Sequence, residues 1–310
     1  MRTHVVLICA LALVGCKKTG TGTGGGGGGG WLVGSDALMA QVDPHGKLGA
    51  GYDLGSQEQL QGIACRYSGE AWVVGTHATL LYTSDAGTTW SPQVVPTTAD
   101  LRALATQDNG PVFVGGDGVF LVSTDTGASW KSLGDAVTKF RSIAAAQSGD
   151  TVLALGDDGS LWSYDATSLA RTQSFAGAHA VAVSADGAIA MIAGHGLSRS
   201  SDGGVTWQAL ATDLAFDDVR IAEDGSAVAV GAGGMIANID PSGHVSTQQV
   251  GTADLHTLHI ADADSPDAAG YAAGDGGQVL ITQDFGASWT LGPNLGRTVW
   301  SVDVIGTGHR

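Results

Sequence analysis

One short motif occurs four times in this chain and constrains the fold more than any other feature. The motif is Ser/Thr-x-Asp-x-Gly-x-Ser/Thr-Trp, and its copies begin at Thr83, Ser123, Ser200 and Thr282. Because each copy fixes five positions, four matches do not arise from amino-acid composition. A motif that recurs along a chain indicates a repeat architecture, in which one supersecondary unit is copied several times.

The residue types of the motif are those of a tight turn between two strands. A carboxylate can accept hydrogen bonds from backbone N–H groups across the turn, and glycine adopts the left-handed conformation without steric cost. The tryptophan is expected to pack against the sheet that the turn joins. We therefore predict a structural role, and no catalytic one, for Asp85, Gly87, Trp90, Asp125, Gly127, Trp130, Asp202, Gly204, Trp207, Asp284, Gly286 and Trp289.

Three weaker copies fill the gaps between these motifs, at Asp43, Asp165 and Asp240. The seven aspartates then follow one another at intervals of 42, 40, 40, 37, 38 and 44 residues. This is the length of one four-stranded propeller blade. The chain also holds 49 glycines, which long helices tolerate poorly. The sequence therefore predicts an all-β protein, a seven-bladed β-propeller with four-stranded antiparallel blades.

The strand pattern also predicts how the ring closes. One repeat shows four short apolar segments, at 101–105, 111–115, 118–124 and 128–133, and the second of these recurs at the N-terminus as Trp31–Gly34. The N-terminal blade thus lacks its inner strand, whereas Val299–Asp303 has the pattern of an inner strand with no blade after it. We expect this C-terminal strand to pair with the N-terminal blade, which would cover both sheet edges.

The N-terminal residues have the pattern of an export signal. The apolar run Val5–Val14 is too short to cross a bilayer and ends in Leu-Val-Gly-Cys16, which resembles a bacterial lipobox. We predict a signal peptide at 1–15, a lipidated Cys16 with a glycine-rich tether at 16–30, and the propeller at 31–310. The protein would then be exported to the bacterial cell envelope and held there by lipid, with its membrane and leaflet undetermined. An ordinary secretory signal is the alternative.

Charge narrows the choice of partners. The formal net charge is −16, with only 14 lysines and arginines. Nucleic-acid binding depends on basic residues that neutralise phosphates, and attachment to anionic lipid depends on them as well. The composition therefore argues against nucleic acid, and it leaves the lipid anchor as the expected contact with a membrane.

The repeats resemble those of a known family. Trp72-Val73-Val74-Gly75 and the segment from Leu80 to Trp90 resemble the Asp-box, or BNR, repeats of photosystem II stability and assembly factor-like propellers. The resemblance covers about 31–309 and is weakest around Asp43, Asp165 and Asp240. It implies a propeller that acts through its surface as an accessory factor without catalysis. A photosystem role is not carried over, since nothing in the sequence indicates a photosynthetic source.

The inner strands supply candidate binding residues. Propeller ligands usually meet the face where these strands begin, and the second residues of the predicted strands are Gln61, Arg102, Arg141, His179, Val219, His256 and Trp300. Arginines beside an aromatic ring could take an acidic or aromatic group of a partner. Alternatively, they pair with aspartates between blades. We predict a binding face of Arg102, Arg141, His179, His256 and Trp300 on a monomer that binds a protein, with a glycan as the less favoured ligand.

A sialidase-like glycoside hydrolase is the alternative function. Such an enzyme needs an arginine cluster and a Tyr/Glu pair, but the mature chain holds only Glu58, Glu70 and Glu223. No metal site or cofactor is predicted. The acidic loop at 262–267 lacks the helix-flanked calcium motif, and His256 and His259 should point to opposite faces of one strand.

Overall fold

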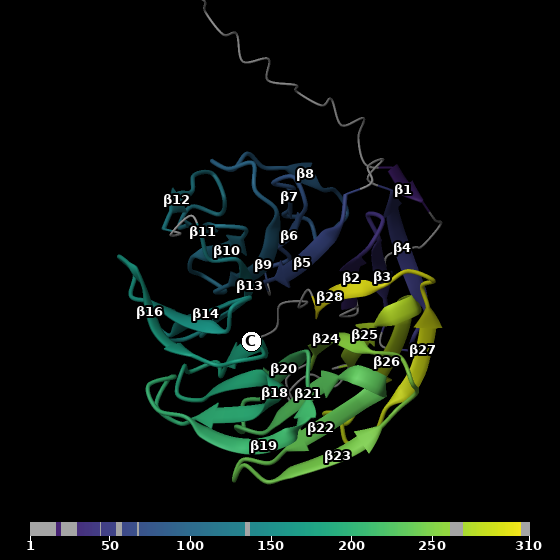
Figure 1. Cartoon of the computed structure of the whole chain (residues 1–310). Helices are drawn as coiled ribbons and strands as arrows, with labels where there is room; N and C mark the ends of the chain where they lie inside the picture. Colours follow the sequence, from purple (N-terminus) through teal and green to yellow (C-terminus); the bar gives the residue numbers. More distant parts are fainter. Residues whose placement is uncertain are drawn as a thin grey trace, which may run out of the picture.

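The computed structural model describes residues 17–19, 30–43, 45–53, 58–66, 68–133, 137–260 and 269–304. These residues form seven antiparallel sheets in a ring around a central opening (Figure 1). The helices within these ranges are two single 3-10 turns, η1 (Ala232–Gly234) and η2 (Asp275–Gly277). Neither turn is long or apolar enough to span a membrane. The prediction of an all-β, seven-bladed propeller is confirmed.

The blades are numbered along the chain, and their strands are as follows. Blade 1 contains β1 (Lys17–Thr19), β2 (Gly30–Gly34), β3 (Met39–Val42), β4 (Leu48–Asp53) and β28 (Val299–Val304). Blade 2 contains β5 (Leu60–Cys65), β6 (Ala71–Gly75), β7 (Leu80–Thr83) and β8 (Ser91–Pro92), and blade 3 contains β9 (Leu101–Thr106), β10 (Val112–Gly116), β11 (Val119–Ser123) and β12 (Lys131–Ser132). Blade 4 contains β13 (Phe140–Ala145), β14 (Val152–Gly156), β15 (Ser160–Tyr164) and β16 (Leu169–Ser174). Blade 5 contains β17 (Ala178–Val183), β18 (Ala190–Ser200) and β19 (Gln208–Ala215), and blade 6 contains β20 (Asp218–Ile221), β21 (Ala227–Gly231), β22 (Met235–Ile239) and β23 (Val245–Gln249). Blade 7 contains β24 (Leu255–His259), β25 (Gly270–Gly274), β26 (Gln278–Thr282) and β27 (Thr290–Asn294).

Ring closure occurs as the sequence predicts. The C-terminal strand β28 pairs antiparallel with β2, and Trp31 lies opposite Asp303 while Leu32 lies opposite Val302. β28 is therefore the innermost strand of blade 1, although it lies at the other end of the chain. The two ends of the ring are thus joined by backbone hydrogen bonds within one sheet.

The hydrophobic core lies between neighbouring blades. One cluster joins Trp31 and Val33 of blade 1 to Leu60, Ile63 and Val73 of blade 2, and all five side chains are buried. Such packing follows from strands that are apolar on both faces, since each blade is covered on both sides. The ring is therefore stabilised by contacts that each blade makes with its two neighbours.

Short polar side chains also join the inner strands of adjacent blades. The Ser301 hydroxyl accepts a hydrogen bond from the Ile63 amide at 3.3 Å, and the Thr257 hydroxyl accepts one from the Val302 amide at 3.1 Å. The buried Asp218 carboxylate accepts the Leu258 amide in the same way. The amides of one inner strand thus find acceptors on the preceding blade, which satisfies buried donors.

The repeated motifs form the turns that the sequence predicts. In blade 3, Asp125 accepts the Ser129 amide at 2.8 Å, and the buried Ser123 hydroxyl accepts the Gly127 amide at 2.7 Å. Gly127 has a φ of +88°, in the left-handed region. The weaker copies keep this role, because Asp43, Asp165 and Asp240 also accept backbone amides of their turns. The motif also takes up part of the segment predicted as the outermost strand, so β12 is shorter than 128–133.

Two local features differ from the expected pattern. In blade 5, β18 forms both middle strands, because its first half pairs with β17 and its second half pairs with β19. At the N-terminus, Lys17–Thr19 pairs with β4 as the outermost strand β1, with Lys17 opposite Asp53. The tether interpretation does not hold for these three residues, since a glycine-poor segment beside an open sheet edge can extend the sheet. Cys16 and the signal peptide lie outside the described residues.

Candidate functional site

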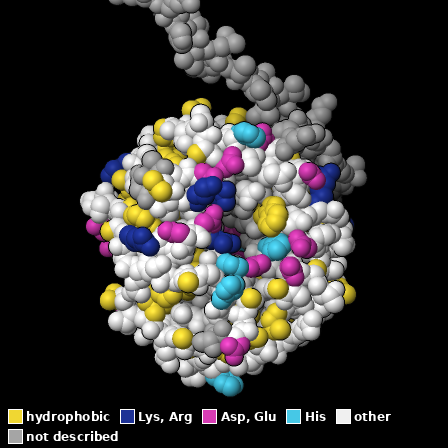
Figure 2. Space-filling view, viewed as in Figure 1, with side chains coloured by type: hydrophobic (Ala, Val, Ile, Leu, Met, Phe, Trp, Pro, Cys, Tyr) yellow, Lys and Arg dark blue, Asp and Glu magenta, His cyan; other side chains and the backbone are white. Residues whose placement is uncertain are grey.

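A funnel of about 440 Å³ opens at the centre of the ring, where the inner strands begin. Figure 2 shows this face, with charged and histidine side chains gathered around a central hollow. The five predicted binding residues Arg102, Arg141, His179, His256 and Trp300 all line this funnel, together with Gln61. The structure thus brings residues from six blades to one opening, which we call the channel mouth.

A repeated irregularity of the inner strands places these side chains. In β5, Leu60 pairs with Gly75 and Gly62 pairs with Val74, so Gln61 has no opposite residue. The same skip occurs at the second residue of β9, β13, β17, β24 and β28. A residue that is left out of a β-ladder in this way is a bulge, and a bulge re-aims its side chain. The bulges therefore deliver one side chain from each of these blades to the mouth.

The position predicted in blade 6 is wrong. Val219 is fully buried, and Asp217 lines the mouth in its place. The buried Phe216 takes the first inner-strand position, because its backbone lies against Gly231 as that of Leu101 lies against Gly116. Two successive aspartates interrupt the apolar pattern here, so counting from the sequence began the strand two residues late.

One side of the mouth carries two of the arginines that line it. Arg102 Nε lies 2.6 Å from Asp117 Oδ1, and Arg102 Nη1 lies 3.4 Å from Asp157 Oδ2 on the next blade. Lys139 also contacts Asp117. Arg141 is held less closely, since its Nε lies 3.8 Å from Asp157 Oδ1. The alternative in which arginines pair with aspartates between blades therefore applies to Arg102, which contacts Asp157 of the next blade, whereas Arg141 contacts Asp157 within its own blade and at a longer distance.

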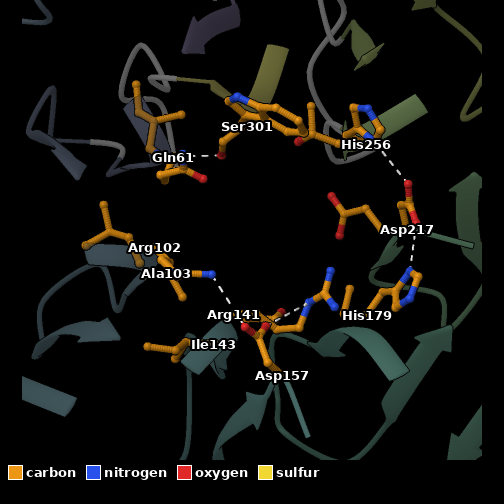
Figure 3. A pocket seen from close by; sticks show the side chains of 18 of the residues that line it. Gln61, Arg102, Ala103, Arg141, Ile143, Asp157, His179, Asp217, His256 and Ser301 are labelled. Atoms are coloured by element: carbon orange, nitrogen blue, oxygen red, sulfur yellow. Dashed lines mark hydrogen bonds and ion pairs between the residues drawn. The ribbon is translucent and has the colours of Figure 1, made fainter. Parts of the chain in front are cut away.

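The opposite side carries a chain of histidines and carboxylates. Asp217 accepts His179 Nδ1 at 2.7 Å and His256 Nδ1 at 3.0 Å, and His256 Nε2 lies 2.9 Å from Asp275. Figure 3 shows His179 and His256 on either side of Asp217, with Arg102 and Arg141 turned toward Asp157 across the opening. His179 of blade 5 and His256 of blade 7 therefore both contact the carboxylate of Asp217 in blade 6.

The histidines determine the protonation of this cluster. Burial alone would raise the pKa of Asp217, but the hydrogen bonds and charges of His179 and His256 outweigh it, so the pKa falls well below its usual range. The hydrogen bond to Asp217 in turn raises the pKa of His256, against the opposing effect of burial. The ionised pair is thus favoured at this side of the mouth.

Trp300 completes the mouth on the closing strand. Its ring stacks on His256, with 4.9 Å between ring centroids, and the residue remains 37% exposed. A tryptophan on a ring-closing strand offers an apolar surface next to charged groups. The mouth thus combines free guanidinium donors, carboxylates and one accessible aromatic ring.

Sequence reasoning missed the carboxylates that complete the mouth, although a local signal was present. Asp117, Asp157 and Asp275 each follow the glycine that ends the second strand of their blade. The inner strand of the same blade begins beside that glycine, so each of these aspartates lies at the same end of the blade as the bulged residue. A Gly-Asp step after a Val/Ala-rich strand is the pattern that could have identified them.

The turn motifs lie away from this site. Second and third strands are joined at the mouth end, and the motif follows the far end of the third strand, as Asp125 follows β11. The motif aspartates therefore belong to the opposite face. At that end, His259 Nδ1 contacts Asp303 at 2.7 Å, so His256 and His259 pair with separate carboxylates.

The mouth offers little for the hydrolase or for a metal. Among the described residues, neither a tyrosine nor a glutamate lines the funnel, although a sialidase-like site needs both. No group of three or more His, Cys, Asp or Glu in the described ranges is arranged to hold a metal ion. The acidic loop at 262–267 lies outside these ranges.

Comparisons with known proteins agree with the fold. Residues 50–133 match the family model described as photosynthesis system II assembly factor YCF48. A solved structure of YCF48 bound to a D1 peptide is 21% identical, with a TM-score of 0.58, and the alignment covers 75% of this chain and 81% of that one. YCF48 from Cyanidioschyzon merolae is 15% identical, with a TM-score of 0.61, and coverage is 79% and 88%.

Propellers of other kinds are similar as well. Virginiamycin B lyase from Staphylococcus aureus is 13% identical, with a TM-score of 0.63, and the alignment covers 76% of this chain and 84% of that one. No curated protein sequence matches the chain. Likeness at this level of identity establishes the fold alone. The chain is a BNR-type β-propeller that resembles the YCF48 assembly factor.

Proposed function

We propose that this protein is a membrane-anchored scaffold of the bacterial cell envelope that binds a segment of a partner protein at the channel mouth. The observation that carries the proposal is the convergence on one open funnel of side chains from six bulged inner strands, together with Asp217 of blade 6. A ring whose inner strands served only to hold the fold together would not need exposed arginines and an exposed tryptophan at its centre.

The mouth is suited to a peptide with a charged and an apolar group. Arg141 is 36% exposed and its ion pair with Asp157 is long, so most of its guanidinium donors are available to a ligand. Trp300 lies across the opening as an apolar contact, and arginine and tryptophan are the residue types that contribute most at protein interfaces. That the YCF48 structure holds a D1 peptide gives a precedent for peptide binding by a propeller of this type.

The location rests on the N-terminal sequence. The apolar run before Cys16 and the small residue at Gly15 are typical of a bacterial lipoprotein signal. A lipid on Cys16 would hold the propeller at a membrane surface without a membrane-spanning segment. Replacing Cys16 by Ser should move the protein from the membrane fraction to the soluble fraction, and mass spectrometry of the mature N-terminus provides a direct check.

A crosslinking experiment tests the binding role. A photoreactive phenylalanine analogue at position 300 should capture a partner in intact cells, and Arg141→Ala should reduce recovery of that partner at least tenfold. Arg171→Ala is the matched control, because Arg171 lies on the exposed strand β16 of the same blade, away from the mouth. Equal recovery with both variants would exclude the mouth as the binding site.

A further inference from the structure

A lipid on Cys16 would be attached next to the outer rim of blade 1. β1 begins at Lys17, and its three residues pair with Gly51, Tyr52 and Asp53 of β4. Successive Cα atoms are about 3.8 Å apart, so Cys16 lies one such step from a strand fixed on the rim. A flexible tether of fourteen residues would instead reach about 20 Å. The pairing of β1 therefore removes most of the freedom that the sequence suggests.

Exposed leucines lie on the same part of the rim. Leu48 begins β4 and is 46% exposed, and Leu291 lies on β27, the outermost strand of blade 7, and is 67% exposed. The turn before Leu48 packs on blade 7, because a Cβ added at Gly46 would lie 3.1 Å from Ile281 Cδ1. A groove of about 320 Å³ separates this turn from Leu291. Figure 1 shows β1, β4 and β27 along one stretch of the rim.

We infer that the rim formed by β1, β4 and β27 rests on the lipid bilayer, so that the propeller is held edge-on with its channel axis along the membrane plane. This inference rests on the proposed lipidation of Cys16. The occupant of the rim is the bilayer that carries this lipid, because the anchor enters it within one residue of β1. Leu48 and Leu291 enter the apolar boundary beside the anchor, as exposed apolar side chains do at membrane contact sites.

This orientation leaves the channel mouth accessible. The mouth lies at the centre of one face of the ring, whereas β1 and β27 are the outermost strands of their blades and β4 lies next to β1. A partner segment that projects from the same membrane could therefore reach the mouth from the side. A propeller lying flat on the membrane would instead cover one of its two faces.

Tryptophan quenching on vesicles tests the orientation. The chain from residue 16 with Cys65→Ala keeps Cys16 as its single cysteine, which is coupled to a maleimide lipid in phosphatidylcholine vesicles that contain brominated lipid. Leu291→Trp is compared with Val205→Trp, a position on blade 5 that is equally exposed at 69%. We expect the brominated lipid to quench the added tryptophan at 291 at least twice as strongly as that at 205.

A second variant tests the role of β1. Proline at position 18 cannot donate a ladder hydrogen bond, so Lys18→Pro should release β1 and abolish the difference between the two positions. Its melting temperature should stay unchanged, since β1 is a three-residue edge strand. Equal quenching at 291 and 205 in the coupled protein with intact β1 would overturn the edge-on orientation. Because coupling is chemical, this result is independent of whether cells attach a lipid to Cys16.

Discussion

Removal of the closing strand is the perturbation that tests the architecture most directly. A chain that ends at residue 296 lacks β28, and with it Val299 and Val302, which are 0% and 1% exposed. Full burial of a valine side chain is worth roughly 1.5–3 kcal/mol, so these two residues alone contribute about 3–6 kcal/mol. The Ile63 and Cys65 amides also lose their acceptors on Ser301 and Asp303.

The expected loss is large compared with the stability of a folded domain, which is about 5–15 kcal/mol. For a protein of this size, each kcal/mol lowers the melting temperature by roughly 2–4 °C. The loss of the two valines alone should therefore lower the melting temperature by roughly 6–24 °C, measured by thermal unfolding with circular dichroism. Val302→Ala, which removes two methyl groups, should lower the free energy of unfolding by roughly 1.5–3 kcal/mol in a urea titration.

Two controls separate ring closure from a general effect of truncation. Removing residues 305–310 alone, or five glycines from 25–29, should shift the melting temperature by about 1 °C or less, as terminal and linker residues usually do. A synthetic peptide of residues 297–304, added to the truncated chain, should restore part of the lost stability. If the chain that ends at 296 melts like the intact protein, β28 does not close the ring, and the interpretation of blade 1 is refuted.

Three further predictions concern single side chains. Ser123→Ala leaves the buried Gly127 amide without its acceptor and should lower the free energy of unfolding, measured by chemical denaturation, by about 1–3 kcal/mol. An unchanged free energy of unfolding would contradict the structural role of the turn motif. Asp217→Asn should lower the melting temperature more at pH 6 than at pH 9, because the raised pKa of His256 gives stability that is present below about pH 6.5 and is lost as the pH rises through the folded-state pKa. An equal effect at both pH values would contradict the pairing of His256 with Asp217. Burial, and then the charge of Asp303, raises the pKa of the partly buried Cys65, so its thiol should react with Ellman's reagent at pH 8 at least tenfold more slowly than in urea. A rapid reaction in the folded protein would contradict this raised pKa.

The sequence alone determined the blade architecture of this protein, because the interactions that define a blade are local. Each turn motif uses residues within eight positions, as Ser123 and Asp125 bind the amides of Gly127 and Ser129. Short apolar strands between such turns can form only an antiparallel blade, and seven copies require a ring. The pairing of Val299–Val304 with the N-terminal blade could also be predicted, because that blade lacks an inner strand and the C-terminal segment has the pattern of an inner strand with no blade after it.

The tertiary structure alone decided the chemistry of the channel mouth. The mouth unites side chains that lie about one blade apart along the chain, and whether Arg102 and Arg141 are free or paired depends on Asp117 and Asp157, whose positions follow from the ring. The register of blade 6 could not be counted from sequence, because Asp217 precedes the paired residues of β20 and two successive aspartates obscure the start of the strand. Likewise, the pairing of β1 with β4 depends on an open sheet edge that forms only after the blade has folded. The turn motifs can be predicted because their interactions join neighbouring residues, whereas a site built by several blades forms only once the ring has closed.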